Sequence, residues 1–264
     1  MIYVCMPSYN EAPTVGLVLW KIRRVFEEFP REYQLLVADD ASTDATFDVL
    51  EPYAKALPLT VLRHAERQGY AKSVEELLRL ALERSDRPKR DAAVVMHADF
   101  AHNPEFLPEI VRRLDSGADL VLTRATVLGE PSRGVRWVRK SARFLLGGSV
   151  PGSSDVASGF GAFRLIALRN ALRTSGPTLL RTDGWTANAE LFSRTAEHSR
   201  RIEVVDTVER HDLRSRPGRI EPWTQAKELW RNRRQLWMRG PRRSGPRGPE
   251  GRGAESNDLQ EVTS

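Results

Sequence analysis

Short apolar runs alternate with longer amphipathic segments along the first two-thirds of the chain. Several runs are continuous in Val, Leu and Ile, which is typical of strands that are covered on both faces. This alternation predicts an α/β fold with an open, mostly parallel sheet flanked by helices. The predicted strands are residues 2–6, 34–38, 59–63, 92–97, 119–123 and 201–205. The predicted helices are residues 14–28, 45–56, 71–83, 104–114, 135–146, 165–172 and 186–197, with helix-start residues at Asp44 and Asn103.

The remaining segments have the composition of loops. Gly, Pro and Ser gather in residues 129–134 and 147–154, which predicts loops there. Residues 241–264 are rich in Gly, Pro and Arg and hold almost no large apolar side chains. Such a segment buries too little surface to fold, so we expect the tail to be disordered.

Cysteine usage and hydropathy narrow the class of protein. The only cysteine among the 264 residues is Cys5, inside the first apolar run. This excludes a disulfide framework and a cysteine-based zinc cluster, and we expect Cys5 to be a small buried hydrophobe. No apolar run approaches the roughly 18–20 residues that span a bilayer. The apolar start ends at Pro7, so we expect no signal peptide and a cytoplasmic protein, soluble or peripheral to the membrane.

The positive charge is a feature of the C-terminal end. The net charge is +6, but residues 231–252 alone hold eight Arg and one Glu, and residues 253–264 hold three acidic residues. The first 230 residues therefore carry only +2. A nucleic-acid function would depend on the tail, where an Arg/Gly segment gives only non-specific, salt-sensitive binding, so we expect no specific nucleic-acid partner.

Polar residues follow three of the predicted strands. Residues 7–11 follow the first strand, Asp39 to Asp44 follow the second, and His97 and Asp99 follow the fourth. Because ligands of open α/β sheets bind beyond the carboxyl ends of the strands, we expect these clusters to converge at one edge of the sheet.

Each cluster allows more than one interpretation. Asp39 and Asp40 would repel each other unless a metal ion, a base, sugar hydroxyls or helix N-terminal amides offset the charge, and Asp44 also fits a simple helix cap. His97 and Asp99 are two residues apart, so both could point to one side and hold a metal ion on a diphosphate. The alternative is a helix cap at Asp99 beside a hydrogen-bonded His97.

Three common nucleotide or hydrolase motifs are missing from the sequence. No Gly-x-Gly-x-x-Gly follows the first strand, and the chain has neither Gly-x-x-x-x-Gly-Lys-Ser/Thr nor Gly-x-Ser-x-Gly. These absences argue against a dinucleotide-binding Rossmann domain, a P-loop NTPase and an α/β-hydrolase.

Five segments in order carry a family resemblance. Residues 7–11 (PSYNE), 37–44 (VADDASTD) and 68–71 (QGYA) resemble family 2 glycosyltransferases of the GT-A fold. Residues 96–105 (MHADFAHNPE) are similar to the Met-Asp-Ala-Asp-Leu-x-His-x-Pro-Glu segment of the dolichol-phosphate (polyprenol-phosphate) mannosyltransferases. Residues 154–164 (SDVASGFGAFR) are similar to their Ser-Asp-x-x-Ser-Gly-Phe-x-x-Tyr-Arg segment, and 188–191 and 201–205 follow in the expected order. The resemblance covers about residues 2–220.

The resemblance implies an inverting transfer of a hexose, most simply mannose from GDP-mannose, to a polyprenyl or dolichyl phosphate. It implies that Asp99, Arg214 and Asp40 are catalytic and that Asp99 and His97 hold a divalent metal. It also implies donor binding by Pro7, Tyr9, Glu11, Asp39, Asp40 and Gly69, with Arg124 and Arg139 as further phosphate contacts.

Two departures from the family pattern concern the predicted metal site. His97 replaces the first metal-binding Asp of the family, and Ala101 replaces a residue that is usually Gln or Ser. Because imidazole suits softer ions, we expect Mn²⁺ to be favoured over Mg²⁺. The departures keep two alternatives open: a family 2 enzyme with a soluble acceptor, or a nucleotide-sugar-binding protein with a degraded metal site.

A tryptophan stripe follows the predicted catalytic domain. Trp223, Trp230 and Trp237 recur every seven residues, and basic residues flank them. We predict a GT-A domain over residues 1–221, a basic amphipathic helix over 222–240 and a disordered tail over 241–264. The helix suits a membrane interface, and packing of the stripe on the domain or on a second subunit is the alternative.

Overall fold

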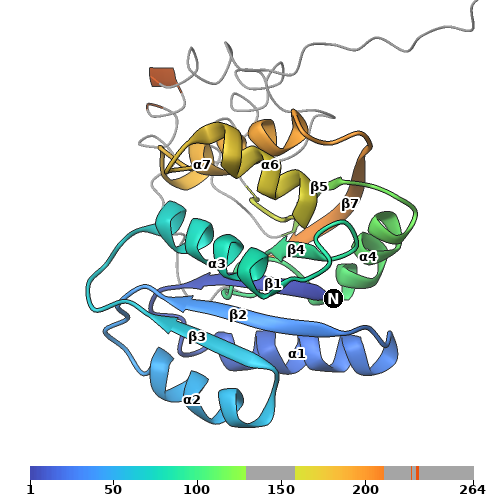
Figure 1. Cartoon of the computed structure of the whole chain (residues 1–264). Coiled ribbons are helices and arrows are strands. Elements are labelled where there is room, and N and C mark those ends of the chain that lie inside the picture. Colours follow the sequence, from blue (N-terminus) through green and yellow to red (C-terminus); the bar gives the residue numbers. More distant parts are fainter. Residues whose placement is uncertain (129–157, 211–226, 228–229, 232–264) are drawn as a thin grey trace, which may run out of the picture.

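The computed structural model describes residues 1–128 and 158–210, together with Lys227, Trp230 and Arg231. Its centre is a seven-stranded sheet in the order β3-β2-β1-β4-β6-β5-β7 (Figure 1). The strands are β1 (Ile2–Ser8), β2 (Tyr33–Asp39), β3 (Leu59–Arg63), β4 (Ala92–Val95), β5 (Leu120–Leu128), β6 (Gly161–Arg164) and β7 (Ile202–Arg210). β6 pairs antiparallel with β4 and β5, and the other pairings are parallel.

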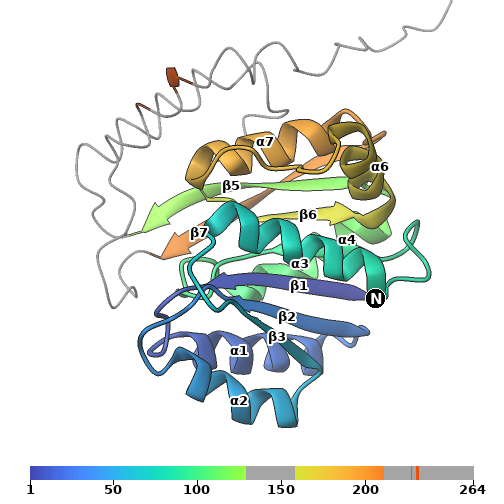
Figure 2. The same cartoon turned by 60° about the vertical axis from the view of Figure 1, so that its left-hand side comes forward.

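Helices cover both faces of this sheet (Figures 1 and 2). One face packs against α1 (Val15–Glu28), α2 (Thr46–Ala56) and α4 (Leu107–Asp115), and the short helix η1 (Pro104–Phe106) leads into α4. The other face packs against α3 (Tyr70–Arg84), α6 (Leu165–Ser175) and α7 (Gly184–Ala196).

Strand β1, near the middle of the sheet, shows why helices cover both faces. In β1, Ile2, Val4 and Met6 enter the core with α1, whereas Tyr3 and Cys5 enter the core with α3. Successive side chains of a strand point to opposite faces, so a continuous apolar run needs a helix on each side. Cys5 is fully buried, as predicted.

The predicted α/β class and mostly parallel sheet are confirmed. The structure adds β6, which is too short and too rich in Gly and Ala to stand out in the sequence. β5 and β7 pair along nine residues each and are longer than predicted, whereas β4 ends at Val95 instead of residue 97. The predicted helix 135–146 and the loops 129–134 and 147–154 lie outside the described residues, as does the tail 241–264. No helix in the described part of the chain is long and apolar enough to cross a membrane.

Candidate active site

A pocket of about 170 Å³ opens beyond the carboxyl ends of β1, β2 and β4. Because these strands are neighbours in the sheet, the three polar clusters converge as predicted. The lining residues are Pro7, Ser8, Tyr9, Glu11, Asp40, Arg67, Tyr70, Ser73, His97, Ala98 and Asp99. The predicted residues in this wall are therefore Pro7, Tyr9, Glu11, Asp40, His97 and Asp99.

Asn10 joins the loop after β1 to the loop after β2. Its main-chain N–H donates to Ser42 Oγ at 2.8 Å, and its side-chain oxygen accepts from the N–H of Thr43 at 2.7 Å. Asn10 has a φ of 53°, a left-handed conformation that asparagine tolerates better than most residues. The next residue continues the contact, because the N–H of Glu11 donates to Thr46 Oγ1 at 2.8 Å. The two loops thus form one rim of the pocket.

Asp40 holds a third loop against this rim. Its Oδ1 accepts from the N–H of Gln68 at 2.7 Å, and its Oδ2 accepts from the N–H of Gly69 at 2.9 Å. Nδ1 of His64 lies 2.8 Å from Oδ1 of the same carboxylate. Asp40 is 4% exposed, so these groups provide the charge compensation that the adjacent carboxylates require. Of the options left open by the sequence, amides at the N-terminal end of α3 supply part of this compensation, and the imidazole of His64 is a partner that the sequence reasoning did not name.

His64 bridges two carboxylates. Its other ring nitrogen, Nε2, lies 2.7 Å from Glu76 Oε2. Burial lowers the pKa of His64, but the hydrogen bonds to Asp40 and Glu76 outweigh burial and raise the pKa above its usual value. The imidazole therefore ties the rim to α3, and it donates to both carboxylates when it is protonated.

Asp39 has a different environment from Asp40. It is fully buried and is not among the residues that line the pocket. Its Oδ1 accepts from the N–H of Ser42 at 3.2 Å, and its Oδ2 lies 4.0 Å from Nε of Arg63. The structure therefore places the predicted donor residue Asp39 behind the pocket wall.

Arg67 is a pocket residue that the sequence reasoning missed. Its guanidinium carbon lies 4.2 Å from the ring centroid of Tyr9, and its Nε lies 3.9 Å from Asp40 Oδ2. The side chain is 61% exposed, so the cation faces the open part of the pocket. The position directly before the 68–71 motif was the available sequence indication, but the abundance of arginine in this chain obscured it.

His97 and Asp99 occupy a tight turn after β4. Asp99 Oδ1 accepts from the N–H of Ala101 at 3.0 Å. Phe100, which lies between Asp99 and Ala101, has a φ of 63°. The predicted helix-cap alternative for Asp99 is not the arrangement seen, because Asn103 is the residue whose side chain caps η1, accepting from the N–H of Glu105 at 3.1 Å.

His97 and Asp99 thus both line one pocket, and an imidazole with a carboxylate suits a divalent ion that also binds ligand oxygens. The described residues hold no group of three or more His, Cys, Asp or Glu side chains that could hold a metal ion by themselves. The diphosphate oxygens of a bound nucleotide would have to complete the coordination.

Tyr70 connects this turn to α7. Its hydroxyl donates to Asn188 Oδ1 at 2.7 Å, and its ring meets the ring of His97 edge-on at 5.7 Å between centroids. Burial and the charges of Asp183 and Asp99 raise the pKa of Tyr70, although the hydrogen bond to Asn188 opposes the change. Tyr70 therefore remains a neutral hydrogen-bond donor.

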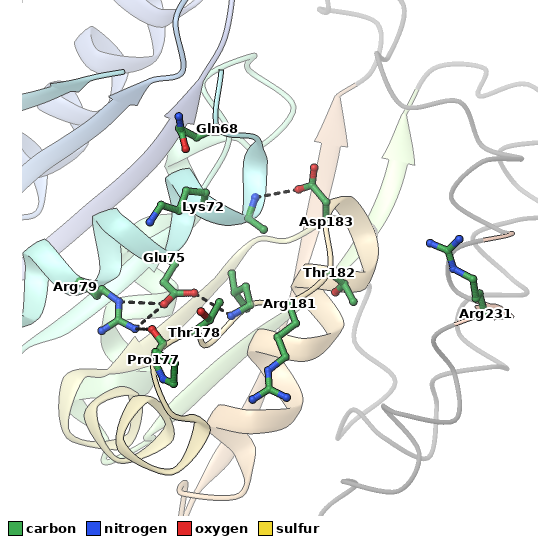
Figure 3. Close-up of a pocket in the computed structure, with 12 residues that line it drawn as sticks. Gln68, Lys72, Glu75, Arg79, Pro177, Thr178, Arg181, Thr182, Asp183 and Arg231 are labelled. Carbon is green, nitrogen blue, oxygen red and sulfur yellow. Dashed lines mark hydrogen bonds and ion pairs between the residues drawn. The ribbon is translucent and has the colours of Figure 1, made fainter. Parts of the chain in front are cut away.

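A second hollow of about 530 Å³ lies beside the first turns of α3 (Figure 3). Loop 176–183 forms one wall, and two buried glutamates hold it. Glu75 Oε2 accepts from the N–H groups of Leu179 and Leu180 at 2.9 Å each, while its Oε1 binds Arg79 (Figure 3). Glu190 Oε2 accepts from the N–H of Arg181 at 2.7 Å.

The end of this loop reaches the start of α3. Asp183 Oδ1 accepts from the N–H of Ala71 at 2.9 Å (Figure 3). Gly69 is the N-cap residue of α3 and has a φ of 92°, and a Cβ at this position would lie 3.3 Å from Asp183 Oδ2. Gly69, which the sequence assigns to donor binding, thus has a structural reason for lacking a side chain.

The remaining predicted site residues lie elsewhere. Arg124 is exposed on β5, where its Nη1 lies 3.4 Å from Asp206 Oδ1 of β7, and it does not line the pocket. Arg139 and Arg214 lie outside the described residues.

Comparison with known proteins gives one family. Residues 3–170 match the model of glycosyl transferase family 2. The chain is 28% identical to an undecaprenyl-phosphate mannosyltransferase of Micrococcus luteus over 208 residues, which are 76% of this chain and 79% of that protein. It is 27% identical over 126 residues to a dolichol-phosphate mannosyltransferase of Pyrococcus furiosus, and the match spans 48% of this chain but only 33% of that protein.

The fold comparison agrees. A glucosyl-3-phosphoglycerate synthase of Mycobacterium tuberculosis, solved with Mn²⁺, UDP-glucose and phosphoglyceric acid, superposes with a TM-score of 0.58 at 21% identity. This match covers 90% of the present chain and 78% of the synthase. It supports the GT-A fold.

Proposed function

This chain belongs to glycosyl transferase family 2, and from that premise we propose that it transfers a hexose from a nucleotide-diphospho-sugar to a polyprenyl phosphate. The observation that carries the proposal is the pocket beyond β1, β2 and β4, which brings His97 and Asp99 together with Tyr9 and Arg67. The names of the relatives from M. luteus and P. furiosus support a lipid phosphate as acceptor and mannose as the sugar. GDP-mannose is therefore the donor that we propose to test first.

The proposed reaction is a single displacement. A phosphate oxygen of the acceptor attacks the anomeric carbon, the bond from that carbon to the nucleoside diphosphate breaks, and the configuration inverts. The acceptor is already an anion, so the reaction needs no strong general base. The protein mainly has to align the two substrates and stabilise charge on the departing diphosphate.

The chain offers groups for each of these tasks. Tyr9 and Arg67 form a stacked pair at the pocket rim and would bind the nucleotide part of the donor. His97 and Asp99 would hold a divalent ion, which supplies positive charge at the diphosphate when it is bound. Asp40 keeps the 64–69 loop in place, so we propose that its contribution to catalysis is made through that loop. Arg124 and Arg139 remain predicted phosphate contacts, and Arg214 remains a predicted catalytic residue.

We propose a membrane surface as the place of the reaction. Trp230 is 57% exposed, and Lys227 and Arg231 beside it are exposed as well. A Trp side chain between basic residues suits the interface of an anionic bilayer. The other residues of the predicted 222–240 stripe, Trp223 and Trp237, lie outside the described part of the chain. Flotation with phosphatidylglycerol vesicles tests this, and equal flotation of a chain ending at Glu221 would refute it.

The transfer itself is tested with the purified full-length protein. Labelled GDP-mannose, GDP-glucose, UDP-glucose and UDP-GlcNAc are each offered with polyprenyl phosphate and Mn²⁺ or Mg²⁺. Label that enters the organic phase with one donor supports the proposal and identifies that donor. Donor binding without any label in the organic phase would contradict a lipid acceptor. It would then favour a soluble acceptor or a binding protein without turnover.

A further inference from the structure

His102 packs directly against the turn that carries His97 and Asp99. Its side chain is 2% exposed, and its Nδ1 lies 3.0 Å from the main-chain N of His97. The rings of His97 and His102 are 4.6 Å apart between centroids. His102 therefore contacts both the backbone and the imidazole of a proposed metal ligand.

The partners of His102 define its hydrogen-bonding state. A main-chain N–H can only donate, so Nδ1 must accept from His97. In the neutral ring the hydrogen then lies on Nε2, which donates to Ser158 Oγ at 3.0 Å. Ser158 is 1% exposed, so this contact is sealed from water.

Further contacts fix the position of the His102 ring. The His102 ring stacks on Phe160 at 4.8 Å with an interplanar angle of 10°. The carbonyl oxygen of Phe160 accepts from Thr123 Oγ1 at 2.8 Å, which ties the stack to β5. His102 also forms a β-bridge with Glu209 of β7. The ring is thus held from the part of the sheet opposite the nucleotide rim.

We infer that His102 is a positioning residue that fixes the His97–Asp99 turn in its ligand-binding conformation before the ligand arrives. The inference rests on the proposed function, since it assigns the turn to a metal ion and a nucleotide diphosphate. The turn includes the left-handed Phe100, and the side chain of Ala101 is only a methyl group, which adds no hydrogen bond to the turn. Groups that orient metal ligands from behind typically change metal affinity about 10- to 100-fold when they are replaced.

Three variants of the full-length chain separate positioning from packing. His102→Phe keeps a ring on Phe160 but removes both hydrogen bonds. His102→Asn places an oxygen near the former Nδ1 and retains an acceptor for the N–H of His97. Ser158→Ala removes the partner of Nε2 and leaves the contact with His97 in place.

The readout is Mn²⁺ affinity, measured by electron paramagnetic resonance of free Mn²⁺ with saturating GDP and, separately, with saturating UDP. We expect His102→Phe to weaken Mn²⁺ binding about 10- to 100-fold. We expect His102→Asn to stay within a few-fold of the wild type, and Ser158→Ala to fall between them. Thermal unfolding is followed in parallel, because a purely structural role would change the midpoint without this order of affinities.

The outcomes are distinct. Wild-type Mn²⁺ affinity in His102→Phe, or equal losses in the Phe and Asn variants at equal unfolding midpoints, overturns the inference. If His102→Phe does not fold, Ser158→Ala decides: reduced affinity at an unchanged midpoint supports the inference, and unchanged affinity overturns it. If the wild-type chain binds GDP or UDP but binds no Mn²⁺ in the presence of either nucleotide, the metal assignment and the inference are both overturned. Normal Mn²⁺ binding without lipid glycosylation refutes only the proposed acceptor.

Discussion

Asp40 and His64 form the contact that joins the loop after β2 to the loop after β3, with 2.8 Å between Oδ1 and Nδ1. The same imidazole reaches Glu76 on α3, so one titratable side chain connects the pocket rim to the helix behind it. This arrangement makes the rim sensitive to pH.

The pH dependence follows from the raised pKa of His64. Its folded-state pKa lies above the unfolded value of about 6.5, because the bonds to Asp40 and Glu76 outweigh burial. The stabilisation is therefore complete below pH 6.5 and is lost as pH rises through the folded-state pKa. We expect the free energy of unfolding to fall over this range, and to fall less in His64→Gln. His198→Gln serves as the control, and an identical pH profile in His64→Gln would contradict the prediction.

The Ser158–Phe160 segment depends on a glycine. A Cβ on Gly159 would lie 2.6 Å from Asn188 Nδ2, and Gly159 has a φ of 71°. Gly176 also has a positive φ, of 84°, but a Cβ there meets nothing within 4 Å. Gly176→Ala thus measures the backbone cost alone, about 1–3 kcal/mol.

We expect Gly159→Ala to cost about 1–3 kcal/mol more than Gly176→Ala, because the methyl group overpacks against Asn188. Urea unfolding of both variants measures the difference. Equal losses would show that Asn188 moves aside freely.

Glu75 holds loop 176–183 by accepting hydrogen bonds from its main chain, a contact that we call the glutamate clamp. This contact predicts that the loop becomes less stable when Glu75 is changed. Burial raises the pKa of Glu75, but the amides of Leu180 and Leu179 and the cation of Arg79 outweigh it and lower the pKa below its usual value. Glu75→Gln weakens these bonds and should cost about 1–3 kcal/mol.

Amide hydrogen exchange at Leu179 and Leu180 checks this, and we expect both amides to exchange faster in Glu75→Gln. Glu83→Gln is the matched control, since Glu83 is exposed on the same helix. Unchanged exchange at both amides would argue against the clamp.

The guanidinium of Arg67 at the pocket rim predicts a contribution to nucleotide binding. Arg67 stacks on Tyr9 and lines the pocket. Arg63 makes the same kind of contact with Phe47, with 3.9 Å between its guanidinium carbon and the ring centroid, but Arg63 does not line the pocket. We expect Arg67→Met to weaken GDP or UDP binding about 10- to 150-fold, because a charge-assisted contact is worth about 1.5–3 kcal/mol. Calorimetry on Arg67→Met and Arg63→Met makes the comparison, and equal affinities in the two would remove Arg67 from the donor site.

The histidine at the proposed metal site predicts the preferred ion. Imidazole is a softer ligand than carboxylate, so we expect transfer to be faster with Mn²⁺ than with Mg²⁺ and to stop in EDTA. His97→Asp should raise the activity with Mg²⁺. Full activity in EDTA would argue against a metal, and an unchanged ion preference in His97→Asp would place His97 outside the site.

The class of fold and the position of the pocket follow from the amino-acid pattern alone. Continuous apolar runs such as the one through Cys5 need helices on both faces, and parallel neighbouring strands bring residues 7–11, Asp40 and Asp99 to one edge. These features depend on local pattern and sheet geometry, so they can be read along the chain.

The contacts that individual side chains make depend on how distant elements pack together. Asp39 and Asp40 are adjacent in sequence, but successive side chains of an extended backbone point to opposite sides, so one is buried behind the wall and the other holds the 64–69 loop. The contacts of His64 with Asp40, of Ser158 with His102 and of Asn188 with Tyr70 join residues that are 24, 56 and 118 positions apart. Such contacts depend on packing between distant elements, and no local pattern encodes them.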